Sequence, residues 1–146
     1  GIRLHSQPDS SKIWQKRTLM PTPYITKQEE DVPLQMRGKE VFKFAVGAST
    51  TEVEALLKEI GMSKSDVRFY MVHQANLRII DAIKKYLDEP DEKFPVNIQD
   101  HGNSSSASCA ILLDECNRKG MFKPGDILVF SAFGAGLLSA AAVLEW

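Results

Sequence analysis

Several features of other protein classes are missing from this 146-residue sequence. Its two cysteines, Cys109 and Cys116, are too few for a disulfide framework, and they lie in one apparently helical stretch that suits a reducing cytosol. No segment is long and apolar enough to span a membrane, and the opening GIRLHSQPDSSK has no apolar core of a signal peptide. The formal net charge of −1 does not suggest a general nucleic-acid-binding surface. We therefore predict a cytoplasmic protein with neither a membrane nor a nucleic acid as partner.

The bulk composition is that of an ordinary globular protein. Hydrophobic residues make up 43% of the chain and charged residues 25%, and the length suits a single domain. The chain does not begin with Met, so we expect either an added first residue or a start inside a longer polypeptide. Residues 1–35 predict an entry strand, IRLHS, followed by an irregular Pro-containing segment with one helical turn, or a partly ordered tail.

Residues 36–146 show regular hydrophobic patterns that predict the main domain. Helical and strand-like periods alternate along it, and Gly61, Pro90 and Gly120 mark helix ends. This order favours an α/β fold with a largely parallel sheet covered by helices and an antiparallel hairpin at its end. The predicted elements are, in order, helix EVFKFAVGASTTEVEALLKEIG, strand VRFYMVH, helix NLRIIDAIKKYL, strand FPVNIQ, helix SSSASCAILLDECNRKG, strand DILVFSAF and strand LLSAAAVLEW.

Polar residues stand where three of these strands end. His73 and Asn76 follow one strand, Asn103 follows the next, and Gly134 to Gly136 form a tight turn after the third. Ligands bind at such strand ends in α/β sheets, and an imidazole, an uncharged amide and a backbone turn together suit an oxyanion. Each residue alone also has an ordinary structural explanation as a hydrogen-bonded His, a turn-forming or capping Asn, or a hairpin. The spacing alone leaves both explanations open.

Six stretches in order resemble the C-terminal half of the beta-ketoacyl-acyl-carrier-protein synthase III family, in the thiolase-like superfamily. They are EVFKFAV, HQANLRII, GNSSSAS, LLDE, KPGD and AFGAG, and the resemblance runs from about Met36 to Trp146. It implies a thiolase-like half-domain with a five-stranded, mostly parallel mixed sheet covered by helices. It also implies a bacterial, fatty-acid-initiating condensing enzyme that joins acyl-CoA to malonyl-acyl-carrier protein by a decarboxylating Claisen condensation. The resemblance implies no cofactor and no metal.

The resemblance also implies roles for particular residues. In this family a Cys, a His and an Asn form the catalytic triad, and His73 and Asn103 match the last two. The Cys belongs to the N-terminal half, so this chain is expected to be inactive without that half, and the full-length enzyme is expected to be a homodimer. The backbone N–H of Ala135 matches an oxyanion donor. Asn76, Phe133 and Gly38 match positions that contact the pantetheine arm or the acyl pocket.

Basic residues near the HQAN motif match a surface that docks the acidic acyl carrier protein. Arg78 resembles the family's docking contact, and Lys43 and Lys84 would extend it, whereas Lys85 is read as an ordinary solvated position. Two stretches depart from the family pattern. SSS replaces the more usual TSA after Asn103, and LLSAAAVLEW replaces an ending with more aromatic and glycine residues. Neither changes the His or the Asn, but both leave the acyl preference open.

Other functions compete with this one. A hydrolase with Cys109 as nucleophile lacks a basic neighbour at useful spacing in the sequence. A metal site made of His73, His101 and the cysteines matches no common zinc spacing. A non-catalytic domain that binds acyl-CoA or the carrier protein, and half of another thiolase-superfamily acyltransferase, both stay open.

Overall fold

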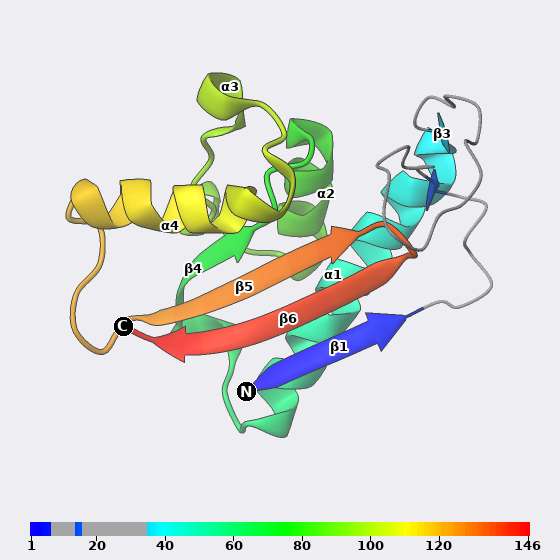
Figure 1. Ribbon diagram of the computed structural model, residues 1–146. Helices are drawn as coiled ribbons and strands as arrows, with labels where there is room; N and C mark the ends of the chain where they lie inside the picture. Colours follow the sequence, from blue (N-terminus) through cyan, green and yellow to red (C-terminus); the bar gives the residue numbers. More distant parts are fainter. Residues whose placement is uncertain (7–13, 16–34) are drawn as a thin grey trace, which may run out of the picture.

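The computed structural model describes residues 1–6, 14–15 and 35–146 (Figure 1). Most of the predicted elements are present, and the predicted α/β class is confirmed. The helices and strands are β1 (Ile2–Ser6), β2 (Trp14–Gln15), β3 (Gln35–Met36), α1 (Gly38–Glu59), η2 (Lys64–Asp66), β4 (Val67–Val72), α2 (Leu77–Leu87), η3 (Asp91–Lys93), α3 (Ile98–His101), η4 (Ser105–Ala107), α4 (Ser108–Arg118), β5 (Ile127–Gly134) and β6 (Leu138–Glu145).

The main sheet is mixed and has four strands in the order β1-β6-β5-β4. Strands β4 and β5 are parallel, whereas β5 pairs with β6 and β6 with β1 in the antiparallel sense. The predicted five strands and mostly parallel pairing are therefore wrong in detail, although the mixed sheet with helices is confirmed. A separate antiparallel ribbon joins β2 to β3, and the predicted irregular segment otherwise lies outside the described residues.

The stretch FPVNIQ does not form the strand predicted for it, because its backbone bonds to a side chain and not to a neighbouring strand. Phe94 follows η3 and stacks on Tyr70 with ring centroids 4.7 Å apart. Pro95 has no N–H to give to a ladder. The N–H of Asn97 donates to the side chain of Gln74 at 3.2 Å, and α3 begins at the next residue. The apolar residues of this stretch therefore lie in a loop that is held by Tyr70 and Gln74.

Helices α1 and α2 cover one face of the sheet and α4 covers part of the other (Figure 1). The alternation along β4 sends Tyr70 and Val72 into the first core and Phe69 and Met71 into the second. Helix α1 ends where Gly61 adopts φ +72°, and Asn76 caps the start of α2. The larger core lies between α1, α2 and the sheet, and includes Ala45, Leu56, Ile80, Ile83, Leu87 and Val129.

Part of the second face is not covered by any described residue. Strand pairing places Leu144 beside Leu128, which packs under α4, and Leu4 beside Ala140 further along the same face. The residues of this open sheet face include Ile2, 74% exposed, Leu4, 80%, and Leu138, 51%. Among the described residues, no helix is long and apolar enough to cross a membrane.

Candidate active site

Three loops at one end of the sheet enclose a cleft of about 510 Å³. One follows β4, the second connects α3 to α4, and the third follows β5. The structure brings His73, Asn103, Phe133 and Ala135 together, although Asn103 follows α3 and not the strand that FPVNIQ was predicted to form. The remaining lining residues are Ser105, Ser106, Ser108, Cys109, Ala132 and Gly134.

His73 is held rigidly at the floor of this cleft. Its backbone N–H donates to the carbonyl of Ser131 at 2.8 Å, which extends the β4–β5 pairing by one residue. Its side chain is buried, with only 6% of the residue exposed, and the ring packs on Phe133 with centroids 5.2 Å apart. Burial lowers the pKa of His73, so the imidazole is neutral at pH 7.

Ser108 fixes which ring nitrogen of His73 faces the cleft. Its Oγ lies 2.5 Å from Nδ1 of His73 and accepts the backbone N–H of Gln74 at 3.2 Å. Because Oγ of Ser108 lies this close to Nδ1 of His73, we assign the hydroxyl hydrogen to Nδ1. The proton of the neutral imidazole then sits on Nε2, and His73 presents an N–H donor to the cleft.

Asn103 is prepared for donation in a similar way. Its Oδ1 accepts the backbone N–H of Ser105 at 2.9 Å, so the amide nitrogen is left for a bound molecule. Ser105 adopts φ +56°, a left-handed conformation that non-glycine residues rarely take. The hydrogen bond from Ser105 to the Asn103 side chain stabilises this strained turn. Backbone strain of this kind is common at binding sites.

The third loop is shaped by a turn that is anchored below it. Gly136 adopts φ +80° and Leu137 φ +47°. The Leu137 side chain is buried, with 1% of the residue exposed. The turn reverses the chain between β5 and β6 and leaves Ala135 on the wall of the cleft. The buried leucine therefore fixes the backbone beside the cleft.

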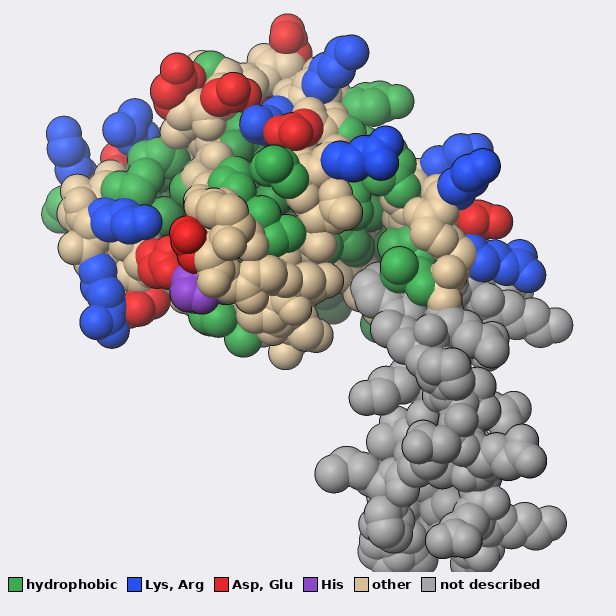
Figure 2. Space-filling view, turned by 90° about the horizontal axis from the view of Figure 1, so that it is seen from above, with side chains coloured by type: hydrophobic (Ala, Val, Ile, Leu, Met, Phe, Trp, Pro, Cys, Tyr) green, Lys and Arg blue, Asp and Glu red, His purple; other side chains and the backbone are tan. Residues whose placement is uncertain are grey.

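Other predicted site residues lie away from the cleft lining. The Oδ1 of Asn76 accepts the N–H of Arg78 at 2.9 Å as the cap of α2, and Gly38 is the first residue of α1. Arg78 and Lys43 are exposed, whereas Lys84 pairs with Asp81 at 2.9 Å and Asp91 at 3.1 Å. Figure 2 shows basic side chains around the rim of the upper face, with acidic ones among them.

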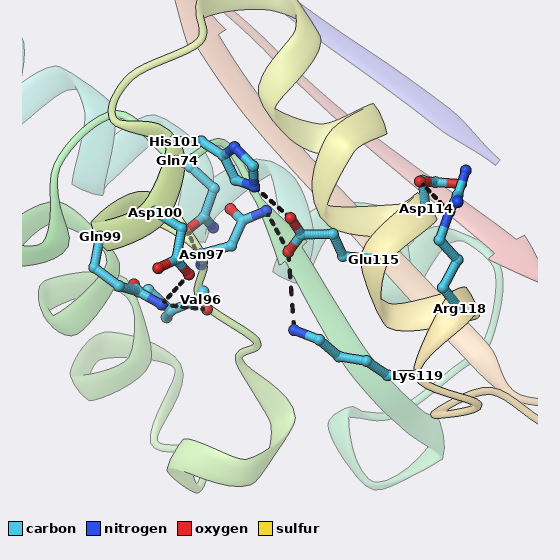
Figure 3. A network of polar contacts seen from close by, with 10 residues as sticks. All are labelled: Gln74, Val96, Asn97, Gln99, Asp100, His101, Asp114, Glu115, Arg118 and Lys119. Carbon is cyan, nitrogen blue, oxygen red and sulfur yellow. Dashed lines mark hydrogen bonds and ion pairs between the residues drawn. The ribbon is translucent and has the colours of Figure 1, made fainter.

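The sequence did not indicate a polar network behind the cleft (Figure 3). Gln74, 1% exposed, and Asn97, 3% exposed, are joined there to Glu115 and His101. In the sequence, the only indication of this network is that Gln74 and Asn97 are polar residues beside apolar runs. Neither a strand period nor a helix period predicts their partners.

The structure weakens both chemical alternatives. Among the described residues, no group of three or more His, Cys, Asp and Glu side chains could hold a metal ion. Cys109 lines the cleft, but burial raises the pKa of its thiol, and its sulfur contacts the carbonyl of Met71 at 3.7 Å. A nucleophilic cysteine needs the opposite shift, so Cys109 fits a packing role.

Comparisons with known proteins agree on one family. Residues 57–146 match the model described as 3-Oxoacyl-[acyl-carrier-protein (ACP)] synthase III C terminal. A beta-ketoacyl-[acyl-carrier-protein] synthase III of Helicobacter pylori strain Shi470 is 39% identical over 136 residues, which are 92% of this chain and 41% of the relative. Its counterpart in Caldanaerobacter subterraneus subsp. tengcongensis is 42% identical over 127 residues, 87% of this chain and 38% of the relative.

Solved structures give the same result. The synthase III of Thermus thermophilus superposes with a TM-score of 0.87 at 38% identity, over 99% of this chain and 45% of that one. The enzyme of Aquifex aeolicus VF5 gives a TM-score of 0.87 at 31% identity, over 99% of this chain and 43% of that one. The chain therefore spans less than half the length of these relatives.

Proposed function

The chain belongs to the 3-oxoacyl-acyl-carrier-protein synthase III family, as its C-terminal domain, and we propose that it supplies one half of the active site of a condensing enzyme. The observation that carries this proposal is that His73 and Asn103 line one cleft while Nδ1 of His73 and Oδ1 of Asn103 are each held by a serine. The nucleophilic Cys would come from an N-terminal half, as the family's triad implies.

The proposed reaction has two steps. First, the Cys thiolate attacks acyl-CoA, forms an acyl thioester and releases CoA. Malonyl-acyl-carrier protein then loses carbon dioxide, and the resulting enolate attacks the acyl carbonyl and expels the Cys thiolate. The product is a 3-oxoacyl group on the carrier protein. The whole enzyme would act as a homodimer without a cofactor.

His73 and Asn103 would act in the second step. Negative charge builds on the malonyl thioester oxygen when carbon dioxide leaves, and two N–H donors in one cleft would stabilise it. A neutral imidazole suits this role because it keeps a donor at Nε2 without the cost of burying a charge. The backbone N–H of Ala135 would hold the acyl thioester oxygen, and Phe133 would border the acyl chain.

The carrier protein would approach the exposed ends of α1 and α2. Arg78 and Lys43 are exposed there and would attract its acidic surface. Lys84 would contribute less, because two aspartates already neutralise it. The amide nitrogen of Asn76 and the backbone at Gly38 would contact the pantetheine arm.

The test separates the two steps. The reading frame upstream of Gly1 is first sequenced, and the full-length polypeptide is assayed for CoA release and for 3-oxoacyl product. We expect His73→Ala and Asn103→Ala each to lower condensation by about 10²- to 10³-fold while the single-turnover burst of CoA release remains. His5→Ala, on β1 outside the cleft lining, serves as the control and keeps full activity.

Two results would reject the proposal. One is an upstream frame without a cysteine-bearing half, which would turn the cleft into a binding site. The other is full condensation by the His73→Ala enzyme, which would show that the imidazole is not needed.

A further inference from the structure

A single carboxylate on α4 holds both ends of the segment that leads to Asn103, and that segment in turn contacts Gln74, the neighbour of His73. Glu115 lies on the side of α4 that faces α3, about seven residues after the helix start. Its Oε1 contacts Nε2 of His101, and its Oε2 accepts the side-chain N–H of Asn97 at 3.1 Å. These two partners lie at opposite ends of the segment Asn97–His101 (Figure 3).

From Asn97 the contacts continue to His73. The backbone N–H of Asn97 donates to Oε1 of Gln74 at 3.2 Å, and the Gln74 amide donates to the carbonyl of Val72 at 2.8 Å. The backbone N–H of Gln74 then donates to Oγ of Ser108, the hydroxyl that contacts the imidazole. Gln74 and Asn97 are almost fully buried, so these bonds are shielded from water.

From His101 the path to Asn103 is shorter. His101 is the last residue of α3, and the following Gly102 donates to the carbonyl of Ile98 at 2.7 Å and adopts φ +63°. Asn103 comes next in the chain. The position of the His101 ring therefore sets where the Asn103 loop leaves α3.

We propose that Glu115 is a positioning residue that braces the His73 loop and the Asn103 loop against α4 and so holds the two donors in register. This inference rests on the proposed function. Glu115 does not line the cleft, so its effect on the reaction passes through His101, Asn97 and Gln74. A displacement of about 1 Å in a reacting geometry can cost about 10²-fold in rate, so a brace of this kind affects kcat strongly.

The neighbouring residue on the same helix offers a matched control. Asp114 pairs with Arg118 at 2.7 Å, one turn further along α4, just as Glu115 lies 3.9 Å from Lys119. Among the described residues, the Asp114 carboxylate bonds only to Arg118, and it lies apart from the network in Figure 3. Asp114→Asn therefore removes one carboxylate and one exposed ion pair from the same helix without touching the brace.

The experiment compares Glu115→Ala, Glu115→Gln and Asp114→Asn in the full-length enzyme. We expect Glu115→Ala to lower kcat about 10- to 100-fold while KM for both substrates stays within about threefold. Glu115→Gln offers one acceptor in place of two, so we expect a smaller loss, about three- to tenfold. Asp114→Asn keeps kcat within about twofold.

A second readout is the ¹⁵N NMR signal of the His73 ring in enzyme labelled at histidine. If the brace acts as proposed, the signals of Nδ1 and Nε2 shift or broaden in Glu115→Gln and stay at their wild-type positions in Asp114→Asn. Glu115→Gln keeps the size of the side chain, so it serves if Glu115→Ala does not fold.

The outcomes for Glu115 and for the reaction itself are distinguishable. Wild-type kcat and unchanged ring signals in both Glu115 variants would overturn the brace, even if their melting temperatures fall. If His73→Ala still condenses at the wild-type rate, the proposed function fails first. A loss of kcat in Glu115→Ala together with a larger loss in His73→Ala supports both.

Discussion

Ser108→Ala tests how the imidazole of His73 is oriented. The change removes the hydroxyl of a buried residue, of which only 2% is exposed. It leaves two buried groups without a partner, Nδ1 of His73 and the backbone N–H of Gln74. Each such group costs about 1–3 kcal/mol, so we expect the free energy of unfolding to fall by about 2–6 kcal/mol. That is a large part of the stability of a typical domain.

The same change has a smaller effect on activity. The hydroxyl favours the Nε2–H form by the net value of one hydrogen bond, about 0.5–1.5 kcal/mol. At about 1.4 kcal/mol for each tenfold step, kcat is expected to fall about two- to tenfold in protein that stays folded. The assays are urea unfolding, kcat for condensation, and the ¹⁵N shifts of the His73 ring.

Ser104→Ala is the control, because its side chain makes no hydrogen bond to a described residue. The reasoning would be refuted if Ser108→Ala lost stability but kept the wild-type kcat and the wild-type ring signals. Ser108 would then only fill space.

Three further predictions concern charge and exposure. Burial lowers the pKa of His73, so the unfolded chain binds a proton that the folded chain rejects, and stability falls as pH drops below about 6.5. Urea titrations between pH 7 and 5 should show this slope, of at most about 1.4 kcal/mol per pH unit, and His73→Gln should flatten it. Arg78→Glu should raise KM for the carrier-protein substrate, most at low salt, while Lys85→Glu changes it little; equal effects would argue against a defined docking contact. The isolated chain should bind a hydrophobic dye and associate, and Leu4→Ser with Leu138→Ser should reduce both, because these side chains lie on the open sheet face; a dye-free monomer would contradict this.

The sequence predicted elements well where burial follows one regular period. The long helix from Gly38 and the strand from Val67 are examples, since neighbouring apolar positions in each share a partner layer. FPVNIQ failed because a side chain, that of Gln74, takes the backbone N–H that a strand would give to a neighbour. No local pattern contains that information.

The candidate site divides in the same way. His73 could be placed at a strand end from local signals, whereas Asn103 follows α3 and not a strand, and the fold brings both to one cleft. Ser108 and Glu115 could not, because the sequence shows each as an ordinary helix residue. Their importance depends on contacts 35 and 18 residues away along the chain, to His73 and Asn97.

The pairing of the first strand with the last has a consequence for synthesis on the ribosome. Ile2 lies opposite Ala142, and the N–H of Val143 donates to the carbonyl of Gly1 at 2.9 Å. Strand β1 therefore leaves the ribosome well before its partner β6. At about 5–20 residues per second, β6 follows β1 only after several seconds or more. We expect β1 to dock late, as the step that closes the longest loop in the domain, and the nascent chain to rely on chaperones until then.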